Sequence, residues 1–309
     1  MEKEWKELEE ACRLRKEKVI DVRNVSVRTP MGIVENKELV KMTPFFLKNL
    51  CNIIGAPYSF FIKCDEDLEQ RIMDAFLPKQ NEYKFLMVNK ELQNLLYSEY
   101  PYFSTEQILN VVQMISKKNK VQILEDEKRG LVVINIASEE KERELKAGDV
   151  VRRGVTIRSQ ISSGRQFIFS GPFLLRLVCT NGMIRREDSI SLLKFQAKDS
   201  EELIRSKLSE DFGEVEFFEN LKSLQNKNIE QPGVLISRLA REVSIGRARD
   251  IIIDRLATIE PNAFEAVNLL SSYANEVGNL SEMRNLQLAA GTLVSTFARR
   301  CQKCGYIIH

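Results

Sequence analysis

The chain has 309 residues, of which 43% are apolar, and its 46 basic and 44 acidic residues leave a net charge of +2. This length allows one large core or two smaller ones, and the near-neutral charge does not by itself single out nucleic acid or an anionic membrane as partner. No stretch approaches the roughly 20 consecutive apolar residues of a membrane-spanning helix. Residues 1–18 are mostly charged and of mixed sign, which predicts an exposed N-terminal helix and not a secretory signal.

The cysteines are scattered along the chain, and only Cys301 and Cys304 are close in sequence. Without a secretory mark, this pattern favours reduced thiols and a cytoplasmic protein.

In the first third of the chain, strand and helix patterns alternate. VIDVRNVSVRTPMGIV, residues 19–34, predicts one or two edge strands. Thr43 and Pro44 predict the start of a helix that Gly55 and Pro57 end, and residues 65–77 predict a second helix. KFLMV predicts a short buried strand, residues 91–96 a short helix, and residues 105–116 a helix with a Ser or Thr cap.

The middle of the chain has the alternation of β-strands. VQIL and LVVINI, between residues 121 and 136, predict a hairpin closed near Gly130. VVRRGVTIRSQ, the turn SSGR and QFIFSGPFLLRLVC then predict two or three further strands. We therefore expect an α+β fold with a central, mainly antiparallel sheet and helices.

From about residue 200 the apolar period changes to that of helices. Leu235 and Leu239 mark one helix, Phe264 and Leu270 a second, and a third begins near Ser281. The predicted organisation is a charged helix at 1–18, an α+β core domain at 19–200, a helical domain at 201–300 and a Cys/His tail at 301–309.

One segment resembles a known family. RLVCTNGM, from Arg176 to Met183, resembles the signature of the phage/plasmid-like domain-of-unknown-function family, which includes the LtrC-like proteins. The resemblance extends over roughly residues 20–300. Three further segments occur in the same order as in that family: KFLMVNKELQNLLYSEY upstream, GDVVRRGVTIRSQISSGR just before the signature and NAFEAVNLLSSYANE downstream. The serine-rich family segment aligns only loosely with residues 158–164. The resemblance implies a gene of phages, plasmids or other mobile elements, often near replication and recombination functions, and implies no particular reaction. If a phage encodes the chain, the expected location is the cytoplasm of the host cell.

Familiar catalytic patterns are missing from the sequence. The single histidine, His309, is the last residue, which argues against Ser-His-Asp and Cys-His catalysis. No G-x-x-x-x-G-K-[ST] loop is present, and no G-x-G-x-x-G follows a strand. Cys179 lies among apolar residues, which favours packing over nucleophilic chemistry. We expect no enzymatic activity; a metal-dependent nuclease, built from carboxylates near an arginine face, is the third-ranked alternative.

The predicted sheet is rich in arginine and in phenylalanine. Between Lys146 and Arg186 there are eight basic residues and one acidic residue, Asp149. Guanidinium groups suit phosphate oxygens, and phenylalanine rings can stack on unpaired bases. The candidate nucleic-acid-binding residues are Arg152, Arg153, Arg158, Arg165, Arg176, Arg185, Arg186, Phe167 and Phe169. A solvated or ion-paired sheet face, or another acidic partner, would give the same pattern.

Two further motifs have a structural or a metal-binding interpretation. Cys179, Thr180, Asn181 and Gly182 are interpreted as a structural turn with positive φ after a buried strand. Cys301, Cys304 and His309 could supply part of a zinc site, completed by another cysteine or a second subunit, or could form an unmetallated tail.

Together these observations predict a non-enzymatic nucleic-acid-binding protein of phage or plasmid DNA metabolism, acting on single-stranded DNA as a binding or annealing factor. The alternative is a protein-interaction or assembly role, structural or host-modulating. We expect no cofactor apart from the candidate zinc and no membrane partner, and we consider a homo-oligomer compatible with the sequence.

Overall fold

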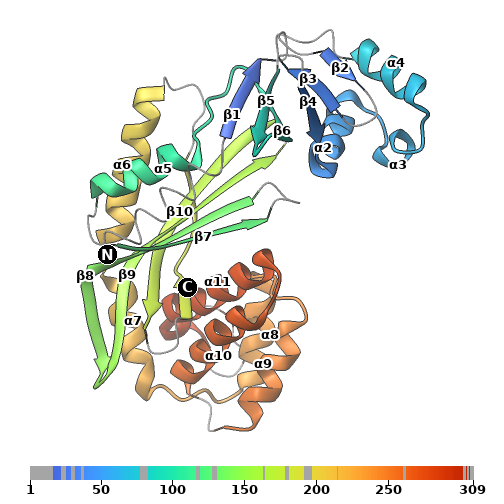
Figure 1. The fold of residues 1–309 in the computed structure, drawn as a ribbon. Coiled ribbons are helices and arrows are strands. Elements are labelled where there is room, and N and C mark those ends of the chain that lie inside the picture. The colour runs from blue at the N-terminus through green and yellow to red at the C-terminus, as the bar shows by residue number, and fades with distance from the viewer. Residues whose placement is uncertain are drawn as a thin grey trace.

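The computed structural model describes residues 17–21, 26–28, 32–35, 38–76, 83–115, 119–126, 131–162, 164–177, 181–190, 197–213, 215–259, 262–301, 304 and 306. Within them the chain forms an N-terminal lobe, a central sheet and a C-terminal helical bundle, and Figure 1 shows the lobe and the bundle at opposite ends of the central sheet. The predicted α+β class, with an antiparallel central sheet followed by helices, is confirmed.

The N-terminal lobe is a six-stranded sheet with three helices. Its strand order is β1-β5-β6-β4-β3-β2, and the strands are antiparallel except for the parallel pair β4 and β6. The strands are β1 (Glu17–Asp21), β2 (Ser26–Arg28), β3 (Gly32–Glu35), β4 (Glu38–Met42), β5 (Tyr83–Val88) and β6 (Glu91–Tyr97). The helices are α2 (Pro44–Ile54), α3 (Tyr58–Phe61) and α4 (Glu66–Phe76). Phe46 and Phe85 meet edge to face in its core, with ring centroids 5.4 Å apart.

Strand β1 is far in sequence from its partner strand in this lobe. It pairs with β5 in the register Glu17↔Val88. The Glu17 carboxylate also accepts hydrogen bonds from the Tyr102 hydroxyl at 2.9 Å and from the backbone N–H of Thr105 at 3.0 Å. The first described strand is therefore fixed by residues 63 or more positions later in the chain.

The central sheet is antiparallel and has the order β11-β10-β9-β8-β7, with β12 pairing beside β11 along β10. Its strands are β7 (Asn119–Asp126), β8 (Leu131–Lys146), β9 (Asp149–Ser162), β10 (Arg165–Arg176), β11 (Asn181–Ile184) and β12 (Asp188–Ile190). The long β9–β10 pairing runs in continuous register from Arg165↔Ser162 to Arg176↔Val151.

The two faces of this sheet are covered differently. On one, the α6 face, Ile134, Ile136 and Ile157 pack with α5 (Thr105–Ile115) and α6 (Ala197–Gly213). On the other, the α11 face, Ala137, Phe173 and Ile184 pack with Leu288 of α11 (Leu280–Thr296). Because α6 belongs to this core, the core extends beyond residue 200, the predicted end of the α+β core domain.

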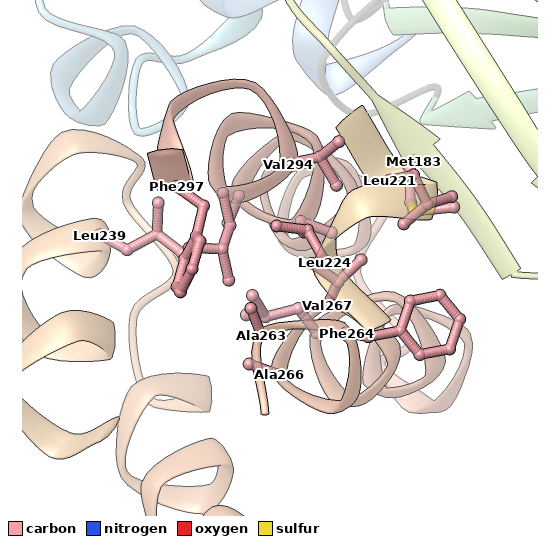
Figure 2. Packing of buried hydrophobic residues seen from close by; sticks show 14 of the residues in the cluster. Met183, Leu221, Leu224, Leu239, Ala263, Phe264, Ala266, Val267, Val294 and Phe297 are labelled. Carbon is pink, nitrogen blue, oxygen red and sulfur yellow. The ribbon is translucent and has the colours of Figure 1, made fainter. Parts of the chain in front are cut away.

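The C-terminal bundle packs around the β11 edge of the sheet. It contains α7 (Glu216–Ser223), η4 (Leu224–Asn226), α8 (Pro232–Glu242), α9 (Ala248–Ala257), α10 (Ala263–Glu276), α11 and η5 (Phe297–Arg299). Figure 2 shows its core, in which Leu221 lies beside Met183 of β11, while Leu239 and Phe297 lie on the opposite side of the view. Among the described helices, none has the length and apolarity needed to traverse a bilayer.

Local signals account for several confirmed elements. Thr43 caps α2 by accepting a hydrogen bond from the Phe46 N–H at 3.1 Å, and Gly55 ends the helix with φ of 73°. Ser104 and Gln107 form reciprocal capping bonds at the start of α5. The predicted β7–β8 hairpin is present, with Asp126 opposite Leu131.

The short helix predicted at 91–96 is wrong, because these residues form strand β6. Asn89 and Lys90 both have positive φ, the conformation of a two-residue hairpin turn, and they fold β6 back onto β5. The prediction for residues 1–18 falls largely outside the described residues, although Glu17 and Lys18 belong to β1.

Candidate functional site

A cleft of about 650 Å³ lies between the N-terminal lobe and the hairpin end of the central sheet. Its volume is within the range of small-ligand sites, roughly 300–1,000 Å³. The residues that line the cleft are Thr43, Pro44, Phe45, Lys48, Asn49, Tyr58, Glu91, Gln93, Gln160, Ile161 and Ser162. They come from the start of α2, from α3, from β6 and from the end of β9.

Hydrogen bonds fix the lobe side of the cleft. The Thr43 hydroxyl, besides capping α2, donates to the carbonyl of Leu92 in β6 at 2.9 Å. The backbone N–H of Thr43 donates to the same carbonyl at 3.0 Å. The Asn49 side chain donates to the Asn94 carboxamide oxygen at 3.1 Å. The first turns of α2 are therefore bound directly to β6.

One contact joins the lobe to the sheet side of the cleft. The Tyr97 N–H donates to the carbonyl of Gly164 at 2.7 Å, at the β9–β10 turn. Gly164 has φ of 73°, and a Cβ there would lie 2.6 Å from the Tyr97 ring. Both the turn conformation and the close approach require glycine, so this residue holds the two walls together.

The chemistry of the cleft is mixed. Lys48 and Glu91 are exposed charges of opposite sign, and the carboxamides of Asn49, Gln93 and Gln160 offer both donors and acceptors. Phe45 and Tyr58 supply ring surface. A planar, uncharged group with donors and acceptors on its edge fits such a lining better than a simple ion does.

An aromatic and cationic surface continues from the cleft along the α11 face. Phe167 lies opposite Gln160, and Arg165 lies opposite Ser162, so both are cross-strand neighbours of cleft residues. The Phe167 side chain is a large exposed hydrophobic group, 42% accessible to solvent. The Arg165 guanidinium lies 4.3 Å above the ring of Tyr100. We refer to Phe167, Arg165 and Tyr100 as the hairpin platform.

The remaining predicted arginines do not form one surface with this platform. Because side chains alternate along a strand, Arg152 and Arg158 lie on the face of Arg165, whereas Arg153 and Arg176 lie on the α6 face. Phe169, predicted as a stacking residue, is covered by the Arg158 guanidinium 3.7 Å above its ring.

Most of these arginines form ion pairs, and all of the paired acids except Asp149 lie outside the arginine-rich segment. The pairs are Arg152 with Glu142 at 2.5 Å, Arg158 with Glu187 at 3.1 Å, Arg176 with Asp149 at 2.6 Å, Arg185 with Glu216 at 3.2 Å and Arg186 with Asp188 at 3.1 Å. Burial lowers the pKa of Arg153, and the positive charge of Arg143 adds to the shift. The local count of charges therefore overstated the free positive charge, because folding supplies counterions from β8, α7 and the residues after β11.

The positive-φ turn predicted at Asn181 and Gly182 is wrong. These residues begin strand β11, in the register Arg176↔Asn181 and Leu175↔Gly182, and Gly182 is not among the glycines with positive φ. A Cβ at Gly182 would lie 2.6 Å from the Phe173 ring and 2.9 Å from the Gln287 side chain. Close packing explains this glycine. Cys179 and Thr180 lie outside the described residues.

The C-terminal cysteines lie near the bundle. Cys301 is half-buried and Cys304 is exposed, and the Cys301 N–H donates to the Tyr306 carbonyl at 2.8 Å. The Arg238 guanidinium lies 3.7 Å above the Tyr306 ring. His309 lies outside the described residues, and among those that are described no three His, Cys, Asp or Glu side chains gather as a metal site.

Sequence patterns did not reveal the cleft, because its walls come from residues 43–58, 91–93 and 160–162. The uncharged polar residues Gln93 and Gln160, within two predicted elements far apart in sequence, do not indicate by themselves that they share a cleft. Comparison of the chain with protein-family models, curated proteins and solved structures found no match. The chemistry of the cleft and the hairpin platform therefore carries the functional interpretation.

Proposed function

We propose that the chain binds single-stranded nucleic acid without catalysing a reaction, as a factor of phage or plasmid DNA metabolism. In this proposal the hairpin platform stacks one base and contacts the backbone, and the cleft takes a neighbouring base. The observation that carries the proposal is the exposed ring of Phe167 beside Arg165 at the mouth of a cleft lined by carboxamides.

Three properties of these residues support nucleic-acid binding, and the first two favour unpaired strands. A phenylalanine that is 42% exposed has a free ring face on which any base can stack. Asn49, Gln93 and Gln160 can pair with base edges, which are accessible only in unpaired strands or in grooves. Arg165, held over Tyr100, presents a cation for phosphate.

The test is fluorescence anisotropy with a labelled single-stranded oligonucleotide, at several salt concentrations, against the same sequence as a duplex. Phe167→Ala should weaken single-strand binding by about 1–3 kcal/mol, the usual contribution of one stacked base. Its thermal stability should change little, since the ring is exposed.

The charge variants use a matched control. Arg165→Gln should reduce the slope of log affinity against log salt by about 0.7, the value for one neutralised phosphate on a single strand. Arg249→Gln changes an exposed arginine of α9, paired with Asp250, and should leave the slope unchanged. Absence of single-strand binding by the unaltered chain at low salt would reject the proposal.

A second candidate function is protein assembly. Phe60 and Ile62, at the end of α3, are 53% and 49% exposed and form a small apolar surface on the lobe. Such a surface fits a partner protein or a second copy of this chain. Sedimentation of the unaltered chain and of Phe60→Ser tests it, because self-association through this surface should be lost in the variant.

A further inference from the structure

Two guanidinium groups and one carboxylate meet beneath the α11 face. Arg158 comes from β9, Glu187 from the residues between β11 and β12, and Arg284 from α11. Their side chains are 17%, 7% and 9% exposed. The Arg158 Nε donates to Glu187 at 3.1 Å, and the Arg284 Nη2 pairs with the other oxygen of the same carboxylate.

Backbone packing places these groups. A Cβ on Gly171 would overlap the carbonyl oxygen of Arg186. The residues that lead to Glu187 therefore cross β10 at Gly171, because glycine has no side chain to block them. In the same way, a Cβ on Gly291 would overlap the carbonyl oxygen of Ile184, so α11 lies against β11 at close range. The two glycines fix Glu187 and Arg284 relative to the sheet.

The cluster has more positive than negative charge. Burial lowers the pKa of Arg284 to about 9, and the neighbouring charge of Arg158 adds to the shift, so Arg284 stays protonated at neutral pH. One carboxylate thus faces two cations. The Nε of Arg284 is also buried and makes no hydrogen bond to a described residue. A buried cation with an unused donor favours an additional anion.

We propose that Arg158 and Arg284 form a binding site for a phosphate group, either free or in a nucleic-acid backbone. Guanidinium forks match phosphate oxygens geometrically, and the charge of phosphate neutralises the surplus. The Arg158 Nη1 donates to Gln160 at 2.9 Å, and Gln160 lines the cleft. If the ligand is a nucleic-acid backbone, the proposal rests on the proposed function, because it places a backbone phosphate next to a base bound in the cleft. If the ligand is free phosphate, the proposal is independent of that function.

The first arm of the test measures thermal unfolding during titration with inorganic phosphate, with sodium chloride holding the ionic strength constant. The unaltered chain should show a saturable rise in Tm, as expected for a ligand of the folded state. Phosphate also stabilises proteins in general by exclusion from their surface, and this effect does not saturate. The control variant Arg249→Gln should show the same saturable rise in Tm, and the same general stabilisation by phosphate, as the unaltered chain.

Variants of the cluster separate binding from folding. Arg284→Met leaves Arg158 and Glu187 as a balanced pair, so the variant should fold and should bind phosphate at least about tenfold more weakly, the equivalent of one charge-assisted hydrogen bond. Glu187→Gln raises the surplus charge, so it should lower the Tm without phosphate, bind phosphate more tightly and regain more Tm on titration. If no saturable phosphate effect occurs in the unaltered chain or in Glu187→Gln, the site does not exist.

The second arm uses the single-stranded oligonucleotide. If inorganic phosphate competes with it and Arg284→Met weakens its binding, the site takes a backbone phosphate. If phosphate binds but the oligonucleotide does not, the phosphate site stands and the proposed function fails. If the oligonucleotide binds with equal affinity to Arg284→Met and phosphate has no saturable effect, the proposed function stands and this site is rejected.

Discussion

Asp149→Ala should destabilise the chain strongly because it removes the counterion of a buried arginine. The Asp149 and Arg176 side chains are 4% and 13% exposed, and they form two hydrogen bonds of 2.6 Å each. Arg176 also donates to Asn268 of α10 at 2.6 Å and lies 5.1 Å above the Phe264 ring. These contacts bind the end of β10 to the bundle and hold the guanidinium in place when the carboxylate is removed.

The expected cost is about 3–5 kcal/mol, the usual effect of leaving one partner of a buried ion pair uncompensated. Replacing both partners, with Asp149→Leu and Arg176→Met, should recover most of it, since apolar residues of similar volume avoid the desolvation of both charges. Urea unfolding followed by far-ultraviolet circular dichroism measures each free energy of unfolding.

Two results would contradict this reasoning. A cost below about 1 kcal/mol for Asp149→Ala would show that Arg176 is effectively solvated, as in a surface pair. Weaker oligonucleotide binding by the stable double variant would mean that Arg176 contacts nucleic acid. We expect unchanged binding, because Arg176 ends a 12-residue strand that begins at Arg165, a span of about 36 Å at 3.3 Å per residue.

Two further predictions concern buried positions of the central sheet. Gly182→Val should lower the free energy of unfolding by at least about 1–3 kcal/mol, through overpacking against Phe173 and Gln287, and urea unfolding with a normal stability would contradict the packing argument. Burial raises the pKa of Asp211, against the effect of the Ser170 hydroxyl, which donates to it at 2.7 Å, and of Lys207. Because the folded state then holds the proton more tightly than the unfolded state, this group makes stability fall as the pH rises from about 4 through the raised pKa. Asp211→Asn removes that dependence, so the free energy of unfolding of the variant should rise relative to the unaltered chain across this window; a pH-independent difference would refute the shift.

Signals that act over a few residues were sufficient for much of the fold. Thr43 and Gly55 bound their helix by capping, and the alternation in β8, β9 and β10 predicted the antiparallel core. Residues 91–96 were assigned wrongly because Glu, Leu and Gln favour helices, whereas the tight turn at Asn89 and Lys90 and pairing with β5 determine a strand.

The candidate site depends on contacts that no local pattern contains. The arginine-rich segment has few acids of its own, but Glu142, Glu187 and Glu216 arrive from other elements and pair with it. Alternation along β9 also divides Arg152 from Arg153. Of the predicted contact residues, Phe167 and Arg165 lie beside the cleft. The carboxamides that line the cleft, Asn49, Gln93 and Gln160, become neighbours only when the lobe packs against the β9–β10 hairpin.

The pairing of β1 with β5 sets an order of events during synthesis. Residues 17–21 leave the ribosome before their partner strand exists, and Thr105, which donates to Glu17, is translated 88 residues later. At 5–20 residues per second this delay is roughly 4–18 s. For most of that time β1 has no neighbouring strand, because its partner residues in β5 follow it by 63–71 positions, and it is open to chaperones or to other nascent chains. The sheet of the N-terminal lobe is thus complete only after β5 has been translated and has paired with β1, the first described strand to be translated. A slower translation rate over residues 22–105 should prolong the exposure of β1.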